Sequence, residues 1–166
     1  MKILFLGPPG AGKGTQAVQV AEELGLAHVS TGDMFRALDP ESDLGRRVAA
    51  IMESGELVPD EIVIEMLEGR IGEPDAANGY ILDGFPRTRP QAEALDAFLG
   101  AAGLDHVVVL EVAADELVTR ILARGRADDT EEAVRTRLAV YDRDTEPLIA
   151  FYEPRGIVRR LSGVGE

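Results

Sequence analysis

Cysteine and tryptophan are absent from this sequence of 166 residues, and lysine and histidine each occur only twice. Without cysteine the chain forms no disulfide and offers no thiolate to a zinc site, so a reducing compartment is permitted. No apolar run is long enough to span a membrane. Met1 leads directly into the first apolar segment, which leaves no room for a signal peptide. We therefore expect a cytoplasmic protein with no membrane partner.

Positive charge is also scarce, because 17 Lys and Arg face 30 Asp and Glu, for a net charge of −13. Such a chain is repelled by nucleic acid outside local basic patches, so we expect no nucleic-acid partner. Its length suits one domain, and an apolar content of 45% is typical of a globular protein. We expect a single domain covering residues 1–166, in which any phosphate binding depends on a local group of cations.

The most informative stretch is GPPGAGKGT at residues 7–15, which follows the apolar run ILFL at residues 3–6. The pattern G-x-x-x-x-G-K between a strand and a helix predicts a phosphate loop, whose backbone N–H groups surround a polyphosphate. Lys13 adds a point charge for the outer phosphates. A glycine-rich turn without a ligand is the alternative. The pattern usually has Ser or Thr directly after the lysine, whereas here Gly14 precedes Thr15.

Apolar segments alternate with helical patterns along the rest of the chain. We expect strands at residues 3–6, 27–30, 79–83, 106–112 and 157–161. This alternation predicts an α/β fold, a five-stranded parallel sheet with helices on both faces. Three helices without a strand lie between the second and third strands, so they form an excursion from the sheet. Ser30 or Thr31 caps the first of them, which begins near Asp33.

Helical spacing also predicts which side chains face the core. We expect these to be Ala17, Val20, Ala21 and Leu24 in the first helix, Ile62, Met66 and Leu67 in the helix opened by Pro59, and Ala92, Leu95 and Phe98 in the helix after the third strand. Asp129 and Glu132 have capping-box spacing. They predict the start of a long helix that continues past Tyr141 toward Tyr152.

Several charged residues stand where chemistry is expected. Asp83 ends a buried strand, where a carboxylate can reach the water ligands of a magnesium ion, although it could instead cap a helix. Arginines are placed at strand-to-helix turns and on helix faces, as phosphoryl transfer requires, or else they form surface ion pairs of little energetic value: Arg36, Arg87, Arg120, Arg124, Arg126 and Arg137. His28 and His106 are interpreted as structural, with no acid–base partner.

Four segments together resemble the adenylate kinase family: GPPGAGKGTQ at 7–16, STGDMFR at 30–36, GELVP at 55–59 and DGFPRT at 83–88. They occur in the family's order, and the resemblance covers essentially the whole chain. Adenylate kinases carry glycine after the loop lysine, so Gly14 matches them. The resemblance implies the P-loop nucleoside monophosphate kinase fold and reversible phosphoryl transfer from Mg-ATP to AMP, giving two ADP.

The resemblance also implies the site residues. ATP is expected to contact Gly10, Ala11, Gly12, Lys13, Gly14, Thr15, Arg120, Arg124 and Gly165. AMP is expected to contact Thr31, Arg36, Glu56, Leu57, Val58, Gly84, Phe85, Pro86, Arg87, Gln91, Arg126 and Arg137. The catalytic set comprises Lys13, Arg87, Arg124, Arg126 and Arg137. Magnesium, the expected cofactor with ATP, is held through water and phosphates near Asp83 and Thr15. No general base is implied.

The chain departs from other family members in two places. Long-lid members have a mobile domain between the positions of Arg124 and Arg126, where this chain has only Gly125, so it resembles the short-lid type. We expect an AMP-binding helical insert at about 30–59 and a short lid loop at about 124–130. Family members also continue into one more helix after the position of Gly165, and this sequence ends at Glu166. That helix normally covers part of the sheet.

Other functions remain open at this stage. A UMP/CMP kinase shares the loop and the DGFPR segment, although Thr31 and Gln91 favour adenine. A nucleotide-binding but inactive truncated relative is a second alternative. A guanine-nucleotide switch is disfavoured because no Asn-Lys-x-Asp segment is present. The expected partners are ATP, AMP and ADP, and size favours a monomer.

Overall fold

The strands of the protein form one parallel sheet in a computed structural model that describes residues 1–125 and 130–163. The sheet has five strands in the order β2-β3-β1-β4-β5. Its strands are β1 (Lys2–Leu6), β2 (Ala27–Ser30), β3 (Tyr80–Asp83), β4 (His106–Glu111) and β5 (Val158–Ser162). Every neighbouring pair is parallel. The predicted fold class and all five predicted strands are therefore confirmed.

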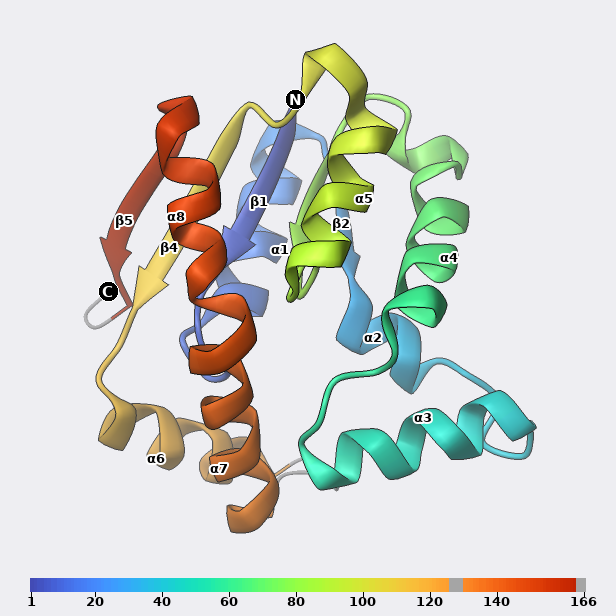
Figure 1. The fold of residues 1–166 in the computed structure, drawn as a ribbon, viewed down its shortest axis with the longest axis vertical. Coiled ribbons are helices and arrows are strands. Elements are labelled where there is room, and N and C mark those ends of the chain that lie inside the picture. The colour runs from blue at the N-terminus through green and yellow to red at the C-terminus, as the bar shows by residue number, and fades with distance from the viewer. Residues whose placement is uncertain (126–129, 164–166) are drawn as a thin grey trace.

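Helices connect the strands on both faces of the sheet (Figure 1). The α-helices are α1 (Lys13–Leu24), α2 (Thr31–Arg36), α3 (Asp43–Ser54), α4 (Asp60–Ile71), α5 (Arg89–Leu99), α6 (Ala114–Arg124), α7 (Glu131–Val140) and α8 (Pro147–Tyr152). Short helical turns are η1 (Pro74–Ala76), η2 (Gly100–Ala102), the π-helical η3 (Tyr141–Thr145) and η4 (Glu153–Arg155). No helix in this described part of the chain is long and apolar enough to cross a lipid bilayer.

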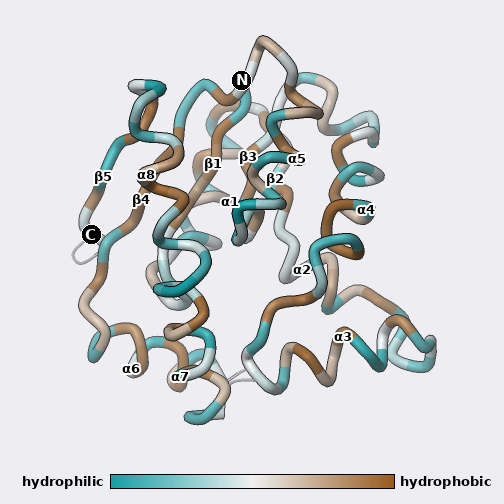
Figure 2. The backbone as a smooth tube through the Cα atoms, viewed as in Figure 1, coloured by the Kyte–Doolittle hydropathy of each residue, from teal (hydrophilic) through white to brown (hydrophobic). Residues whose placement is uncertain are grey.

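The core has two main layers because side chains of each strand alternate between the two faces. On one face, Leu4, Leu82 and Val107 pack with the inner sides of α5 and α8, for example with Leu95 and Leu148. On the opposite face, β1 and β3 pack against α1. Hydrophobic residues follow one another along the central strands (Figure 2). The carboxyl ends of these strands are thus held at one edge by packing on both faces.

Helices α2 and α3 lie away from the sheet, between β2 and α4 (Figure 1). Ser30 caps α2 by accepting a hydrogen bond from the backbone N–H of Asp33, which decides between the two predicted caps. Ser42 caps α3 in the same way through Gly45. The excursion predicted from the sequence therefore consists of two helices that project, while the third, α4, packs beside α5.

Some of the residues predicted to face the core are not buried. Leu24 is 51% exposed and Phe98 is 38% exposed, so neither side chain belongs to the core. In α4 the buried residues are Val63 and Leu67, whereas Ile62 and Met66 are only half-buried. Periodicity locates a helix face, but the depth of each residue depends on which element covers it.

The cap of α7 also differs from the prediction. Its N-cap is Thr130, which accepts a hydrogen bond from the Ala133 N–H, and the predicted cap Asp129 lies outside the described residues. The predicted continuation toward Tyr152 is confirmed. It includes the π-helical η3, whose C-cap Glu146 donates its N–H to the Tyr141 carbonyl at 2.8 Å.

Candidate functional site

A cavity of about 830 Å³ opens at the carboxyl ends of β1 and β3. In a parallel sheet this edge collects the strand-to-helix loops, which is why ligands commonly bind there. Six cationic side chains line the cavity among the described residues, against the three carboxylates of Asp33, Glu56 and Asp83. The cations are Lys13, Arg36, Arg87, Arg120, Arg124 and Arg137. A protein of net charge −13 therefore concentrates positive charge in this cavity.

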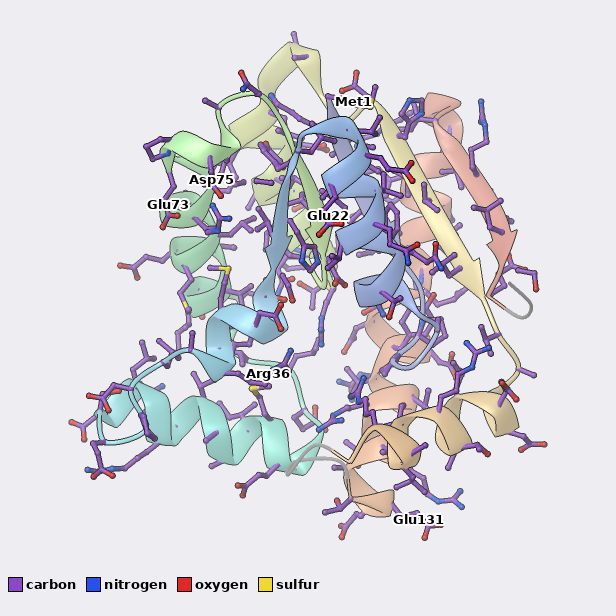
Figure 3. All side chains as sticks on the ribbon, turned by 180° about the vertical axis from the view of Figure 1, so that it is seen from behind. Met1, Glu22, Arg36, Glu73, Asp75 and Glu131 are labelled. Carbon is purple, nitrogen blue, oxygen red and sulfur yellow. The ribbon has the colours of Figure 1, made fainter. Side chains whose placement is uncertain are left out.

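The surrounding surface carries the opposite charge. Glu22, Glu73, Asp75 and Glu131 are all exposed and lie on the outer surface, whereas Arg36 stands at the junction of α2 and α3 (Figure 3). Polyanions are thus repelled by most of the molecule and attracted at one place. This distribution favours a phosphorylated ligand in the cavity.

The loop at residues 7–12 forms one wall of the cavity, between β1 and α1. Gly10 has φ +82°, and a Cβ at this position would lie only 2.7 Å from Ile121 Cγ1. The loop can therefore pack against α6 only with glycine here. The backbone of α1 begins at Lys13, so its free N–H groups and the positive end of its dipole face the loop.

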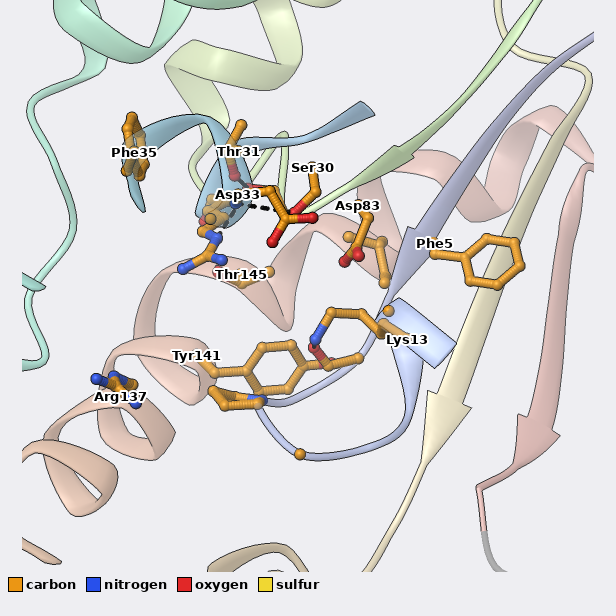
Figure 4. A pocket seen from close by; sticks show the side chains of 18 of the residues that line it. Phe5, Lys13, Ser30, Thr31, Asp33, Phe35, Asp83, Arg137, Tyr141 and Thr145 are labelled. Carbon is orange, nitrogen blue, oxygen red and sulfur yellow. Dashed lines mark hydrogen bonds between the residues drawn. The ribbon is translucent and has the colours of Figure 1, made fainter. Parts of the chain in front are cut away.

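Lys13 projects from the first turn of α1 into the cavity (Figure 4). Its Nζ donates to the carbonyl oxygens of Gly7 at 2.8 Å and Pro8 at 3.1 Å. Burial lowers the pKa of Lys13 to about 8; Asp83 opposes this shift, while Arg87 and Arg124 add to it. The ammonium is thus poorly solvated and surrounded by other cations, a setting in which an added phosphate would bind strongly.

Asp83 ends β3 and faces the same space as Lys13 (Figure 4). Burial tends to raise the pKa of this carboxyl, but the hydrogen bond from His28 and the charge of Lys13 outweigh burial and hold it below its usual range. A Cβ on Gly14 would lie 3.6 Å from Asp83 Oδ2, at ordinary contact distance. A longer side chain at this position would crowd the carboxylate, which is a physical reason for glycine after the loop lysine.

The interpretation of His28 as a residue without an acid–base partner is wrong. His28 Nε2 lies 3.1 Å from Asp83 Oδ2, and His28 lines the cavity. The two residues meet because β2 and β3 are neighbours, with Ser30 opposite Asp83 in the register. The sequence does not tell which strands are adjacent, so this contact had no signal in it.

Arg87 lies opposite the loop and is held by residues of its own segment and by Thr145 of η3. Its Nε donates to the Gly84 carbonyl at 2.8 Å, its backbone N–H donates to Gln91 Oε1 at 2.8 Å, and its carbonyl accepts from Thr145 Oγ1 at 2.7 Å. Burial lowers the pKa of Arg87, and the nearby charges of Arg137 and Arg36 lower it further. Three guanidinium groups therefore converge on one part of the cavity.

Gly84 allows this segment to turn. It has φ +88°, and a Cβ would lie 2.6 Å from Thr31 Oγ1. The Thr31 hydroxyl donates to the Gly84 carbonyl at 2.9 Å, so the start of α2 is joined to the loop after β3. The bond between Phe85 and Pro86 in the same loop is cis. Only glycine combines this backbone conformation with such a close neighbour.

Arg36, at the end of α2, pairs with Asp33 across 2.7 Å, and its side chain is 35% exposed. Arg137 donates to the Met52 carbonyl at 3.3 Å and so reaches from α7 toward α3. Arg120 donates to the Gly163 carbonyl at 2.9 Å and to Glu116 at 3.0 Å. The arginines thus come from elements on every side of the cavity.

Most of the residues predicted for the site line this cavity. They are Gly10, Gly12, Lys13, Gly14, Thr15, Thr31, Arg36, Glu56, Leu57, Val58, Asp83, Gly84, Pro86, Arg87, Gln91, Arg120, Arg124 and Arg137. The side chains of Ala11 and Phe85 are instead buried in the core, at 2% and 1% exposure, so only their backbones remain for a ligand. Arg126 and Gly165 lie outside the described residues.

Tyr141 and Thr145 also line the cavity and were missed by the sequence analysis. Both belong to the π-helical η3, whose wider turn presents its first and last residues to the same space (Figure 4). Burial raises the pKa of Tyr141 to about 12, with Glu146 and Asp142 adding to the effect. A π turn has no sequence pattern comparable to a glycine-rich loop, so neither residue could be found in advance.

Within residues 1–125 and 130–163, no three His, Asp or Glu side chains gather as a ready-made metal site. The cavity offers the Asp83 carboxylate and the Thr15 hydroxyl. One carboxylate with a hydroxyl suits a magnesium ion that arrives on a nucleotide and keeps several waters, because Mg²⁺ is usually bound in this way. The residues present therefore fit a nucleotide-borne magnesium ion.

Comparison with known proteins identifies a family that matches this chain. The family model described as adenylate kinase matches residues 5–157. An adenylate kinase of Nocardia farcinica is 51% identical, over all of this chain and 92% of the relative. One of Stenotrophomonas maltophilia is also 51% identical with the same coverage. One of Kocuria rhizophila is 48% identical over 99% of this chain and 91% of its own length.

Proposed function

The chain belongs to the adenylate kinase family, and from this membership we infer that it transfers the γ-phosphoryl group of ATP reversibly to AMP, giving two ADP. The observation that supports this reaction most strongly is the arrangement of cations around one cavity. Lys13 lies at the phosphate loop, and Arg36, Arg87 and Arg137 lie together across from it. This arrangement supports a separate group of cations for each of two phosphorylated ligands.

ATP is placed with its phosphates along the backbone of residues 10–15, where the N–H groups at the start of α1 can donate to them. Lys13 would contact the outer phosphates, and Arg120 and Arg124 would border the nucleotide. Ala11 takes part through its backbone, since its side chain is in the core. Gly165, which lies outside the described residues, completes the proposed ATP site.

AMP is placed on the opposite wall, with its phosphate on Arg36 and Arg87. The residues at 56–58 and 84–86 would enclose its nucleoside, and Thr31 and Gln91 would contact its base. Arg137, together with Arg126, would act on the phosphoryl group in transit. This placement brings the two phosphates toward each other across the cavity, as an in-line transfer requires.

The chemistry demands alignment and charge neutralisation more than proton transfer. The phosphate of AMP is already an anionic nucleophile near neutral pH, so no general base has to be found among the cavity residues. Negative charge spreads over the transferred group, and cations held in place before the reaction stabilise it without reorganisation. Lys13, Arg87, Arg124, Arg126 and Arg137 are the residues assigned to this task.

Adenylate kinases generally depend on Mg²⁺, and we assign its place here to Asp83 and Thr15, acting through water. The ion would offset part of the charge on the ATP phosphates. The low pKa of Asp83 supports this assignment, because the carboxyl is ionised at neutral pH. His28 would keep that carboxylate oriented by its contact at 3.1 Å.

The domain assignment follows the same reasoning. Residues 30–59, which include α2 and α3, act as the AMP-binding insert, and the loop at about 124–130 acts as a short lid over ATP. Residues 126–129 of that loop lie outside the described part. We further propose a cytoplasmic monomer, which size-exclusion chromatography with light scattering and localisation of a tagged chain would test.

A coupled assay with Mg-ATP and AMP, CMP, UMP, GMP or dTMP as acceptor tests the function directly. We expect AMP to be by far the best acceptor. Turnover of only a pyrimidine nucleotide would contradict the proposal. Titration with a bisubstrate mimic that links two adenosines separates binding from catalysis, since an inactive nucleotide-binding protein would bind the mimic but produce no ADP.

A further inference from the structure

The side-chain amide of Gln91 is held from both ends in the first turn of α5. Gln91 is only 1% exposed, yet it lines the cavity. Its Oε1 accepts a hydrogen bond from the Arg87 N–H at 2.8 Å, and its Nε2 donates to Asp60 Oδ1 at 2.8 Å. A buried amide with two partners of opposite kind has little freedom to rotate.

These partners permit a single orientation of the amide. A backbone N–H can only donate, and a carboxylate can only accept. If the amide were flipped, Nε2 would face the Arg87 N–H and Oε1 would face the Asp60 carboxylate, so both hydrogen bonds would be lost and both contacts would be repulsive. The positions of nitrogen and oxygen in Gln91 therefore follow from the chemistry of Arg87 and Asp60.

The fixed amide can still form further hydrogen bonds. An amide has two N–H donors and two acceptor lone pairs, and within residues 1–125 and 130–163 each end of Gln91 makes the one bond described above. One N–H and one lone pair therefore remain on a side chain that lines the cavity. A base that presents an acceptor next to a donor can pair with them.

Adenine has this arrangement on its Watson–Crick edge, where N1 accepts and the N6 amino group donates. Hypoxanthine has the reverse, because its N1 carries a proton and its O6 accepts. An amide held in one orientation distinguishes the two bases, since the wrong base leaves buried polar groups unpaired. An amide that can flip would distinguish the two bases less well.

We propose that Asp60 is a positioning residue that sets the base selectivity of the monophosphate site by orienting Gln91. This inference rests on the proposed function, which places the base of AMP at Gln91. Asp60 itself is not among the cavity-lining residues and acts only through its neighbour.

The position of Asp60 in the fold suits this role. It is the first residue of α4, which lies beside α5 (Figure 1). The Thr88 hydroxyl also donates to Asp60 Oδ1, at 2.9 Å, and Thr88 in turn caps α5 through the Gln91 N–H. The carboxylate thus joins the beginnings of two helices at the residue that faces the base.

The test compares AMP with inosine monophosphate as acceptors, by kcat/KM at saturating Mg-ATP. For Asp60→Ala we expect kcat/KM for AMP to fall about tenfold with little change for the inosine nucleotide, so their ratio falls about tenfold. Asp60→Asn should restore most of the ratio, because its Oδ1 can still accept from Gln91 and Thr88. An unchanged ratio in Asp60→Ala would overturn the proposal.

Two further variants separate this idea from other causes. Glu61→Ala removes the neighbouring exposed acid in the same first turn of α4 and should leave the ratio unchanged. Gln91→Ala should abolish most of the preference. If Gln91→Ala lowers the ratio and Asp60→Ala does not, the role of Asp60 is wrong and the proposed function stands. If the unmodified enzyme does not phosphorylate AMP, the proposed function itself fails.

An NMR measurement on the unmodified protein covers the case in which Asp60→Ala does not fold. The chain has only three glutamines, Gln16, Gln19 and Gln91, so comparison with Gln91→Ala assigns the side-chain amide signals. We expect the Nε2 protons of Gln91 to exchange with water at least tenfold more slowly than those of the exposed Gln16. Equal exchange rates would show that Asp60 does not hold the amide.

Discussion

The two walls of the cavity are held in place by different kinds of interaction. The wall at residues 7–15 is made mainly of backbone, with Gly10 packed against Ile121 and the start of α1 providing N–H groups. The opposite wall is held by hydrogen bonds from side chains, such as that of the Thr31 hydroxyl to the Gly84 carbonyl and that of the Gln91 amide to Asp60. A backbone wall can recognise phosphate, which is common to all nucleotides. A wall of side chains can distinguish one base from another.

Removing Lys13 should have the largest effect, because it is the only side-chain cation that the backbone wall contributes from residues 7–15. For Lys13→Ala we expect kcat/KM in the coupled assay to fall roughly 1,000-fold. Lys2→Ala, which changes the other lysine of the chain, is the control and should retain activity. A loss of less than tenfold in Lys13→Ala would mean that backbone donors alone suffice.

On the opposite wall, Arg87→Lys keeps the charge but removes the planar group that donates to the Gly84 carbonyl. A misplaced cation aligns the AMP phosphate poorly, so we expect kcat/KM for AMP to fall about 100-fold. Arg89→Lys is the matched control, since Arg89 pairs with Glu93 on the surface. Equal activity of the two variants would show that charge without geometry is enough on this wall.

The pH dependence distinguishes the two walls without a mutation. Because burial lowers the pKa of Lys13 to about 8, the free enzyme loses this charge as the pH rises through 8. The cations of the opposite wall are arginines, which keep their charge at such pH values. We expect kcat/KM for ATP to fall about tenfold per pH unit above 8. A profile that stays flat to pH 9.5 would contradict the assignment.

Binding of ATP should then raise the pKa of Lys13, because the phosphates favour the charged form. The complex should take up protons when ATP binds near pH 8.5. Titration calorimetry in two buffers of different ionisation enthalpy measures this uptake, and Lys13→Ala should abolish it.

The smallest expected effect is on stability, and it is measured by substituting one glycine on each wall. Gly84→Ala places a Cβ 2.6 Å from Thr31 Oγ1 at φ +88°, so we expect a loss of about 2 kcal/mol in the free energy of unfolding. Gly14→Ala places a Cβ 3.6 Å from Asp83 Oδ2 and should change stability little. Urea denaturation of both variants measures the difference. Equal stabilities would contradict the account of the loop after β3.

Local patterns in the sequence predicted much of this molecule. The glycines and Lys13 indicated a phosphate loop because the spacing of such a loop is set by neighbouring residues alone. Apolar runs and helix caps located the five strands and most helices for the same reason. The resemblance carried by residues 30–36, 55–59 and 83–88 predicted a second nucleotide site opposite the loop.

Contacts between distant segments were decided by the tertiary structure. Whether His28 had a partner depended on the order of the strands, which brings β2 beside β3 and His28 to Asp83. Tyr141 and Thr145 reached the cavity through a π-helical turn that has no sequence pattern. The contact between Asp60 and Gln91 required α4 to pack beside α5. Sequence spacing records the neighbours of a residue along the chain, whereas these contacts form only when the helices pack on the sheet.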